Sequence, residues 1–391
     1  MQLTFDDEVA AYLAELVAFL DDNAPTDAAA LERPRSSSHV PPWARAWQRM
    51  QFDNGWLVPG NPPEFGGRNA TILQQYAHQL ELARRRMVPS FNSQGVGIVA
   101  ASLITYGTPE QQRTWAIPIL RAEMTAALGM SEPGAGSDLA SLRTTAVRDG
   151  DHFVVNGQKV WTSGAHDADV ILTFVRTDPD APKHQGISVL VIPTDAPGLV
   201  RRPFAAVADR TDLDFNEVFF TDVRVPVGNL VGELNQGWSV ASGSLGHERN
   251  MLWLSYADRL QDLIGDWHPA TVLERDRFAT LVMDDQALRL LGSAALAKAA
   301  RGEDDVAALS VLKLLGAETV QAASEYALEA CGPAGLRHPD TTTRYVPLNL
   351  DAYAGSWADR YFRSFAGTIA GGTSEIQRNI IAQRVLGLPR R

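Results

Sequence analysis

The sequence predicts an α+β fold in which a helical segment, a β segment and a second helical segment follow one another. Apolar side chains recur at helical spacing in residues 1–121 and again in residues 236–391, whereas short runs rich in β-branched residues fill residues 122–235. Strands and helices are therefore segregated, which argues against a parallel sheet of alternating βαβ units. We predict three domains with these boundaries: an N-terminal helical domain, a middle antiparallel β domain or small barrel, and a C-terminal helical domain.

The first domain opens with an amphipathic helix and contains a second, well-marked helix start. The apolar face of the first helix consists of Val9, Leu13, Leu16, Val17 and Leu20. A stretch rich in proline and serine follows at residues 34–42, and we expect a surface loop there. Further on, Thr108 can cap a helix, Pro109 suits its first position and Gln111 lies three residues after the cap.

Three short apolar runs predict strands in the middle domain. They are residues 153–155, 170–172 and 187–191. Asn156-Gly157 follows the first run, and this dipeptide favours a tight hairpin turn because both central residues need positive φ. We therefore expect a hairpin between residues 153–155 and residues 159–161.

The third domain shows helical periodicity again. Its predicted core positions are Leu288, Leu291, Leu296, Leu309, Leu312, Leu315 and Val320.

The composition indicates an ordinary globular protein that acts on a small molecule. The 391 residues are 45% apolar, the net charge is −11 and the pI is near 5.2, so the chain lacks the basic excess of a nucleic-acid binder. Cys331 is the single cysteine, which leaves no internal disulfide or multi-cysteine metal cluster and suits a reducing compartment. The N-terminus is acidic and no apolar run reaches membrane-spanning length. We expect a cytoplasmic protein without a membrane span.

Several motifs of other enzyme classes are present only in part. Gly134-Ala135-Gly136 begins like a dinucleotide fingerprint, but Leu139 replaces the third glycine. His247-Glu248 lacks the second histidine of a zinc-protease helix, so metal catalysis is unsupported. Ser310 and Lys313 have the spacing of a serine–lysine nucleophile without its companion motifs, and we interpret Lys313 as a helix-surface lysine.

Other segments resemble the acyl-CoA dehydrogenases, in the order found in that family. Residues 130–139 (Met-Ser-Glu-Pro-Gly-Ala-Gly-Ser-Asp-Leu) and 157–164 (Gly-Gln-Lys-Val-Trp-Thr-Ser-Gly) are similar to its two flavin-contact segments, and residues 223–238 to its exit from the sheet. Residues 371–380 (Gly-Gly-Thr-Ser-Glu-Ile-Gln-Arg-Asn-Ile) resemble its C-terminal signature and residues 106–111 its N-terminal one. The resemblance spans nearly the whole chain. It implies an N-terminal helical domain, a β domain and a C-terminal four-helix bundle, with the isoalloxazine ring of FAD between the last two.

The resemblance also implies which residues bind FAD. Trp161 would lie along the flavin face and the Ser163 hydroxyl would hydrogen-bond N5. A turn rich in glycine and serine lets backbone N–H groups approach an electron-rich flavin edge. The implied FAD contacts are Leu128, Met130, Ser131, Gly136, Ser137, Trp161, Ser163, Glu329, Gly332, Thr373 and Glu375.

The adenine half of FAD is partly held by a neighbouring subunit in this family, and here the chain departs from the family pattern. Gly332 and Gly335 match the family's glycine pair, but Glu329 replaces a glutamine. Residues 275–279 (Arg-Asp-Arg-Phe-Ala) only partly follow Arg-x-x-Phe-Gly. The cross-subunit contacts therefore stay open.

Glu248 is the predicted catalytic base. Many relatives place the base directly before a Gly-Thr-Ser stretch, where this chain has Gly371, but Gly246-His247-Glu248-Arg249 resembles the isovaleryl- and long-chain-type arrangement with the glutamate on a helix. Leu245, Glu248 and Leu252 share one helix face, so a carboxylate interrupts an apolar stripe. Burial raises the pKa of a carboxyl group and makes it a better base for a weak carbon acid. A buried ion pair with an arginine is the alternative.

Three residues are predicted to contact the acyl-CoA substrate besides the base. In relatives the backbone N–H at the position of Gly371 hydrogen-bonds the thioester carbonyl, and such a bond strengthens as enolate charge develops. Arg249, about 100° around the helix from Glu248, and Ser137 match residues that contact the substrate.

The implied reaction is α,β-dehydrogenation of an acyl-CoA thioester to trans-2-enoyl-CoA, with electrons passed to an electron-transfer flavoprotein. A homotetramer, or a heterotetramer with a related subunit, is expected. Two alternatives stay open: a flavin oxidase or monooxygenase on the same fold, and one subunit of an enzyme that pairs a base-bearing chain with one that lacks the base. Small residues at Gly95, Gly97, Ala100 and Ala101 indicate either room for a bulky or branched acyl group or helix packing.

Overall fold

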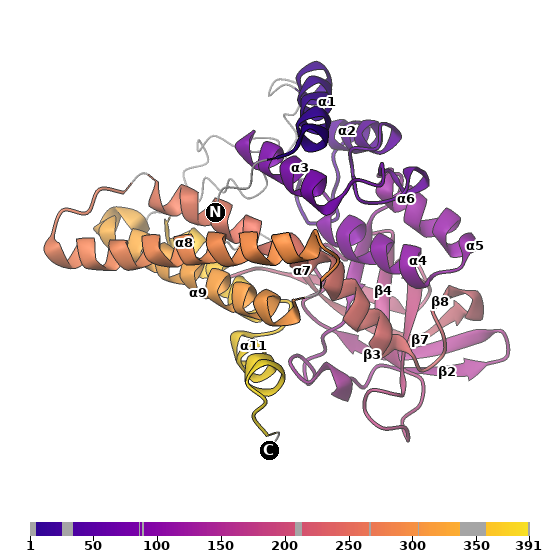
Figure 1. Ribbon diagram of the computed structural model, residues 1–391. Coiled ribbons are helices and arrows are strands. Elements are labelled where there is room, and N and C mark those ends of the chain that lie inside the picture. Colours follow the sequence, from indigo (N-terminus) through magenta and orange to yellow (C-terminus); the bar gives the residue numbers. More distant parts are fainter. Residues whose placement is uncertain are drawn as a thin grey trace. The chain divides into compact units, whose positions relative to one another are not determined.

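A computed structural model describes residues 5–25, 34–85, 87, 90–207, 213–265, 267–303, 305–336 and 357–389 (Figure 1). Within these ranges, the side chains of residues 242–251, 262 and 306 lie outside the description. The chain forms two compact units. Unit 1 comprises residues 1–21, 71–87 and 248–391, and unit 2 comprises residues 22–70 and 88–247. The three domain boundaries drawn from the sequence stay a prediction.

A mixed eight-stranded sheet forms the centre of unit 2. Its order is β6-β7-β3-β2-β4-β5-β8, and β1 pairs with β4 beside this path. Most neighbours are antiparallel, but β1 and β2 each pair with β4 in parallel, so the sheet is not antiparallel throughout. The strands are β1 (Ala126–Gly129), β2 (Thr145–Asp149), β3 (His152–Lys159), β4 (Val170–Arg176), β5 (Ile187–Pro193), β6 (Leu199–Phe204), β7 (Phe215–Pro226) and β8 (Leu230–Val231).

The central strands are buried on both faces of this sheet. Along β4, Val170, Leu172 and Phe174 belong to one apolar core, whereas Ile171 and Val175 belong to another. This alternation follows from the two-residue period of a strand, and it explains why the predicted runs are continuously apolar. All three predicted strand runs are confirmed, within β3, β4 and β5.

Helices of unit 2 cover one face of the sheet (Figure 1). They are α2 (Pro42–Asp53), α4 (Ala101–Tyr106), α5 (Pro109–Gln111) and α6 (Ile117–Leu120), with π-helical turns at Gly95–Ala100 and Gln112–Ala116. The predicted start of α5 is confirmed, because the Thr108 hydroxyl accepts a hydrogen bond from the Gln111 N–H and the Gln111 side chain accepts one from the Thr108 N–H.

The hairpin predicted at Asn156-Gly157 is wrong. Both residues lie inside β3, and the register against β7 shifts between Val155 and Gly157, as in a β-bulge. Gly157 has φ +147°, and a Cβ there would come within 2.6 Å of the Thr144 Cα, so glycine serves a close backbone approach. The tight turn lies earlier in the chain, between β2 and β3, where Gly150 has φ +62°.

The stretch at residues 34–42 is not a simple surface loop. Ser36 and Ser38 are buried, with exposed fractions of 8% and 1%. Proline and serine at this density indicated an irregular backbone correctly, but they carried no information about its burial.

Long helices form unit 1, and α8 and α9 run side by side (Figure 1). The helices are α1 (Asp7–Asn23), α3 (Ile72–Arg84), α7 (Gly237–Ile264, which begins in unit 2), α8 (Val272–Ala299), α9 (Val306–Ala330), α10 (Trp357–Ile369) and α11 (Ser374–Ile380). The first turns of α8 and α9 are capped: Thr271 and Glu274 form a capping box at α8, and the Asp305 carboxylate accepts from the Ala308 N–H at α9.

Most of the predicted core positions of unit 1 are confirmed. Leu288, Leu296, Leu312 and Val320 are buried, and Leu309 and Leu315 pack against the same core. Leu291 is wrong, because 39% of it is exposed. The surface interpretation of Lys313 is also wrong, because only 6% of this residue is exposed. None of the helices in the described ranges combines the length and apolarity that a membrane crossing requires.

Candidate functional site

The first predicted flavin segment leaves the sheet at the end of β1 and forms a tight turn. Glu132 and Ala135 exchange backbone hydrogen bonds of 3.0 and 3.1 Å across this turn. A Cβ built on Gly134 or Gly136 would meet no described heavy atom within 4 Å, and Ser137 is exposed. The turn therefore presents backbone and a hydroxyl to open space, which is the arrangement expected of a cradle for an electron-rich group.

The second flavin segment is joined directly to the first. The Val160 N–H donates to the Ser131 carbonyl at 3.0 Å, and the buried Lys159 ammonium donates to the Met130 carbonyl at 3.0 Å. Lys159 also forms an ion pair with Glu132 at 2.8 Å. Because side chains from both segments meet here, the two stretches of chain are fixed relative to each other.

We call the pair of Lys159 and Glu132 the clamp. Lys159 is 0% exposed, and the other hydrogen bonds of the Glu132 carboxylate come from the N–H groups of Arg143 and Thr144, at 2.7 and 2.9 Å. Burial lowers the pKa of the Lys159 ammonium to about 8, although Glu132 opposes this shift. Burial alone would raise the pKa of Glu132, but the attraction and hydrogen bond of Lys159 outweigh it and hold the pKa below its ordinary value. The clamp is therefore a charged, hydrogen-bonded pair at neutral pH.

Trp161 follows the clamp and combines exposure with a strained backbone. Its φ is +62°, a conformation that bulky residues rarely adopt, and 58% of its surface is exposed. Phe204 and Phe215 contact its ring edge to face, at centroid distances of 5.1 and 5.4 Å. The ring is thus held in place while much of it faces outward, as expected of a wall for a flat ligand.

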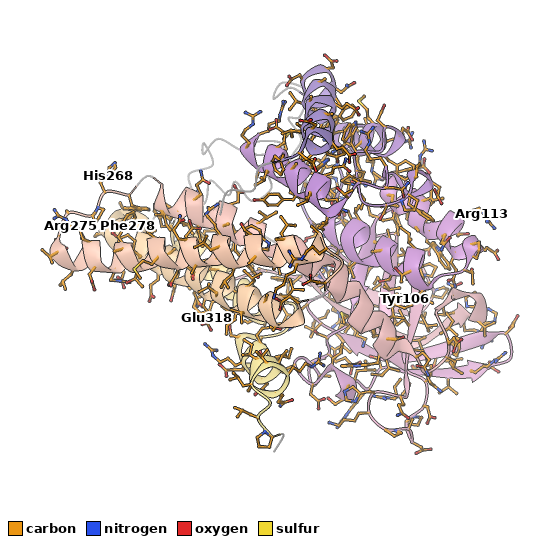
Figure 2. The ribbon with its side chains drawn as sticks, viewed as in Figure 1. Tyr106, Arg113, His268, Arg275, Phe278 and Glu318 are labelled. Carbon is orange, nitrogen blue, oxygen red and sulfur yellow. The ribbon has the colours of Figure 1, made fainter. Side chains whose placement is uncertain are left out.

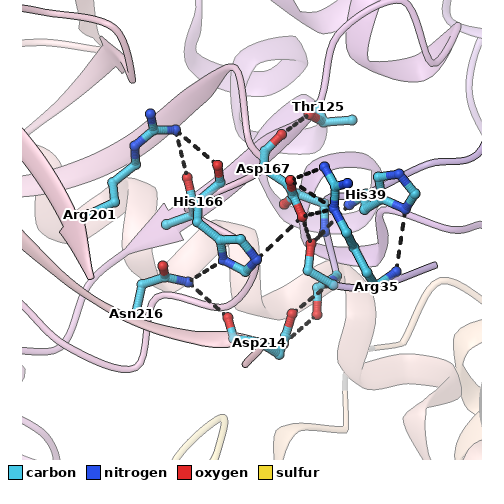
Figure 3. A network of polar contacts seen from close by, with 12 residues as sticks. Arg35, His39, Thr125, His166, Asp167, Arg201, Asp214 and Asn216 are labelled. Carbon is cyan, nitrogen blue, oxygen red and sulfur yellow. Dashed lines mark hydrogen bonds and ion pairs between the residues drawn. The ribbon is translucent and has the colours of Figure 1, made fainter. Parts of the chain in front are cut away.

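A polar network holds the loop that begins at Ser163 (Figure 3). Arg35 forms an ion pair with Asp167 at 2.6 Å, and the Ser36 hydroxyl donates to the same carboxylate at 2.8 Å. Beside it, the backbone N–H and the hydroxyl of Ser37 each donate to Asp214 at 2.6 Å. Contacts from the irregular segment at residues 34–42 therefore hold the Ser163 loop in place.

Backbone contacts complete the support of this loop. The Asn216 side chain donates to the Thr162 carbonyl at 3.1 Å, and the Gly164 N–H donates to the Asp214 carbonyl at 2.8 Å. Gly164 has φ +66°, and a Cβ there would come within 2.6 Å of the Ser38 N–H, so a glycine is required. The Thr162 hydroxyl is buried and has no partner among the described residues.

In unit 1 the predicted substrate contact Gly371 lies in a turn between α10 and α11. Gly371 and Gly372 have φ of +65° and +95°. In the described part of the chain, no backbone acceptor is bonded to the Gly371 N–H, and a Cβ on Gly371 would meet nothing within 4 Å. Thr373 caps α11, its hydroxyl accepting from the Ile376 N–H at 3.2 Å. The turn therefore offers an N–H donor that is bonded to none of the described backbone acceptors, beside a helix N-terminus.

The remaining predicted FAD contacts of unit 1 lie on or beside α9 and α11. Glu375 is exposed and forms an ion pair with Arg378. Arg378 also forms an ion pair with Glu318 of α9, and Glu318 is labelled in Figure 2. Glu329 forms an ion pair with Arg277 of α8. The carboxylate that replaces the family's glutamine is thus engaged by an arginine of its own chain.

The catalytic base predicted from the sequence lies on α7. Glu248 and Arg249 lie within the backbone of α7, but their side chains are outside the described residues. Gly332 begins a 3₁₀ turn with φ +55°, and glycine suits that conformation.

The residues of unit 2 fit a flavin. The exposed aromatic wall of Trp161 and the open glycine turn are features that a bound isoalloxazine and its side chain would use. Of the predicted contacts, Met130, Ser131, Trp161 and Ser163 belong to one connected assembly.

Sequence reasoning missed the residues that hold this assembly. Lys159 and Glu132 lie inside the recognised segments, but nothing in their spacing showed that they pair. Phe204 and Phe215 are brought to Trp161 by the pairing of β6 with β7, which a one-dimensional pattern does not contain. A lysine within a run that is otherwise β-strand-like is the one available signal, because buried charges need partners.

The small residues near position 97 are interpreted either as room for a bulky acyl group or as helix-packing positions, and the structure distinguishes between them. A Cβ on Gly95 would come within 1.8 Å of the Asn92 amide oxygen, and Asn92 is hydrogen-bonded to both backbone groups of Ala126. Ala100 is fully buried. Gly95 and Ala100 are therefore packing positions, whereas Gly97 is exposed and has no described atom within 4 Å of its Cβ position.

Comparisons with known proteins cover nearly the whole chain. The N-terminal, middle and C-terminal domain families of acyl-CoA dehydrogenases match residues 6–123, 127–223 and 235–386. The chain is 35% identical to acyl-CoA dehydrogenase IpdE1 of Mycobacterium tuberculosis, over 98% of both chains. It resembles the solved "Tcur3481-Tcur3483 steroid ACAD" with a TM-score of 0.80 and 32% identity over 100% of both chains. The ChsE4-ChsE5 complex of Mycobacterium tuberculosis gives a TM-score of 0.78 and 30% identity, also over 100% of both.

Proposed function

Because the chain belongs to the acyl-CoA dehydrogenase family and is therefore an oxidoreductase, we propose that it binds FAD and dehydrogenates an acyl-CoA between the α- and β-carbons. The product is a trans-2-enoyl-CoA. The observation that carries the proposal is the exposed, strained Trp161, joined through the clamp to the glycine turn at residues 132–137. An isolated structural tryptophan needs neither the left-handed backbone nor the exposure.

FAD, when bound, supplies the acceptor for the two electrons that leave with the β-hydrogen. We propose that Trp161, Ser163 and the turn ending at Ser137 hold it in unit 2. Leu128, Met130, Ser131 and Gly136 complete that set, and Glu329, Gly332, Thr373 and Glu375 are the proposed contacts of unit 1.

Residues of this chain remove the α-proton of the substrate and stabilise the charge that forms. Glu248 accepts the α-proton, and the Gly371 N–H donates to the thioester carbonyl. Because charge on that oxygen grows as the proton leaves, the hydrogen bond strengthens toward the transition state and acidifies the α-carbon selectively. Arg249 and Ser137 are the proposed contacts to the rest of the substrate.

A bulky, ring-bearing acyl group is the first substrate class to try. The open space at Gly97 supports it, and one similar solved protein is titled a steroid ACAD. Ring-bearing and straight-chain thioesters of matched carbon number distinguish this class from ordinary fatty acyl groups.

We further propose a tetramer, either of identical chains or with a related subunit, that passes electrons to an electron-transfer flavoprotein in the cytoplasm. Apolar side chains on α8 support assembly, because their exposure in one chain is costly in water. They are Val272, Leu273, Met283 and Leu290, between 57% and 80% exposed. Two similar solved structures carry two protein names in their titles. Native mass spectrometry after purification from the source organism separates the homo- from the hetero-oligomer.

Purification and flavin analysis test the proposal. We expect one non-covalent FAD per active site, and a substrate-reduced flavin that persists in air until an electron-transfer flavoprotein is added. Rapid reoxidation in air would favour the oxidase or monooxygenase alternative. Colourless protein that FAD cannot reconstitute, or stoichiometric NADH formation, would contradict the proposed function.

A further inference from the structure

Lys313 of α9 is a buried lysine that the proposed chemistry does not use. Only 6% of it is exposed, and its ammonium donates to the Gly372 carbonyl at 2.7 Å. Burying an ammonium group costs free energy that a methionine of similar length would not. A buried lysine at this position therefore calls for a purpose beyond filling the core.

The acceptor of this hydrogen bond lies in the turn that carries Gly371. Ala370 directly follows α10, its N–H donating to the Ala366 carbonyl, and Thr373 caps α11, so only Gly371 and Gly372 lie between these two residues. Both glycines have positive φ, a region in which glycine has many accessible conformations. Two glycines in sequence do not fix an N–H direction by themselves.

Contacts from outside the turn supply the missing constraint. Besides Lys313, the Gln377 side-chain amide donates to the same Gly372 carbonyl at 3.4 Å, and Gln377 is 3% exposed. The bond from Lys313 is the shorter one and comes from a charged donor, which makes it the stronger of the two. It ties the turn to α9, a helix that packs against both α10 and α11.

We propose that Lys313 is a positioning residue that fixes the Gly371–Gly372 turn so that the Gly371 N–H points at the substrate carbonyl. This role rests on the proposed function of Gly371. In this role Lys313 acts on the backbone of the turn and not on the substrate itself. It acts by holding one backbone conformation, which matters because a misplacement of about 1 Å can cost about a hundredfold in rate.

Hydrogen–deuterium exchange of the purified holoenzyme tests the structural half directly. We expect Lys313→Met to speed exchange of the Ile376 and Gln377 amides, which donate to Thr373 at the end of the turn, about tenfold or more. Lys313→Arg, which keeps a charged donor, should stay near wild type. Lys298→Met is the matched control, because Lys298 is a half-exposed lysine of the same unit at the end of α8. If Lys313→Met does not yield folded protein, Lys313→Gln, neutral but polar, takes its place.

Single-turnover flavin reduction tests the catalytic half, with the acyl-CoA that bleaches wild-type flavin most. We expect Lys313→Met to be about ten- to a hundredfold slower, with acyl-CoA affinity changed by less than about threefold and with recovery in Lys313→Arg. Wild-type exchange in Lys313→Met would overturn the positioning role whatever the activity. Faster exchange with an unchanged reduction rate would overturn its link to catalysis. If wild-type flavin is not reduced by any acyl-CoA, the proposed function fails, and the exchange result still decides whether Lys313 holds the turn.

Discussion

The two regions proposed to act in catalysis are held in opposite ways. In unit 2, the segments at residues 130–139 and 157–164 are joined by a buried ion pair, backbone hydrogen bonds and an aromatic cluster. In unit 1, the turn at Gly371 has no side chain of its own and depends on contacts made to its backbone. The ion pair that joins the segments of unit 2 lies within the recognised motifs, whereas the shortest bond to the turn of unit 1 comes from Lys313, outside them.

This difference indicates which substitutions each region tolerates. Removing a partner of the clamp leaves a charge buried, so unit 2 is expected to fail through loss of folding stability and of its ligand. The turn in unit 1 can lose orientation while the helices around it stay folded. We therefore expect substitutions in unit 1 to slow the reaction while the protein stays folded, and substitutions at the clamp of unit 2 to reduce folding stability and activity together.

The largest effect is expected in unit 1, from Glu248→Gln. The amide keeps the shape of the carboxylate but cannot accept the α-proton, and general-base catalysis is commonly worth about 10²–10⁴-fold. We expect flavin reduction to slow by at least that factor while FAD and acyl-CoA still bind. Stopped-flow absorbance under anaerobic conditions measures the rate.

Glu325→Gln is the matched control for this substitution, because Glu325 is an exposed glutamate on α9 of the same unit. Reduction of Glu248→Gln at the wild-type rate would show that Glu248 is not the base and would favour the buried ion-pair interpretation. Loss of FAD or of folding in this variant would contradict the separation of stability from chemistry in unit 1.

Breaking the clamp is expected to have the next largest effect. Lys159→Met leaves Glu132 buried without its cation, and such losses cost about 3–5 kcal/mol. We expect a lower free energy of unfolding in urea, together with release of FAD. In the same sheet, Arg224 and Asp149 form an ion pair in which both side chains are exposed. Arg224→Met should therefore lower the free energy of unfolding by at most about 1 kcal/mol. Equal losses in the two variants would mean that burial of the clamp is irrelevant.

Trp161 offers a smaller and more selective test of unit 2. Because the side chain is 58% exposed, Trp161→Ala should change folding stability little, yet weaken FAD binding by about tenfold. Trp161→Phe keeps an aromatic wall and should retain most of the affinity. Fluorescence titration of the apoprotein with FAD gives the dissociation constants. An alanine variant with wild-type affinity would remove Trp161 from the site.

The pH dependence of stability should show the smallest effect. The folded-state pKa of Glu132 lies below its ordinary value of about 4.5, so its stabilising contribution is present above that pH and is lost as the pH falls below it. The amide side chain in the Glu132→Gln variant does not titrate, so the stability of this variant lacks that pH dependence. The gap in urea midpoint between wild type and this variant should narrow from pH 6 to pH 4, and a gap that widens would contradict the charged clamp.

Sequence reasoning worked where a local pattern determines the structure. The helix start at Thr108 follows from three neighbouring residues, and the apolar runs of β4 and β5 follow from burial on both faces. The same reasoning failed at Asn156-Gly157, where the dipeptide favoured by hairpin turns serves a bulge instead, because Thr144 approaches Gly157 closely from another part of the chain.

The candidate site divides in the same way. Trp161, Ser137 and Gly371 could be named because they stand in ordered motifs, but their supports could not. Lys313 looked like a surface lysine because helical spacing does not show that α11 and the glycine turn pack over it. Phe204 reaches Trp161 only through the pairing of β6 with β7. Long-range contacts of this kind leave no mark in a single sequence.

Anaerobic titration of the wild-type holoenzyme with straight, branched and ring-bearing acyl-CoAs tests the central claim most directly. The flavin absorbance reports electron transfer, and chromatography of the quenched mixture identifies the product. We expect bleaching by at least one class of acyl-CoA, with one trans-2-enoyl-CoA formed for each flavin reduced. A flavin that dithionite reduces but that every acyl-CoA leaves fully oxidised would contradict the central claim.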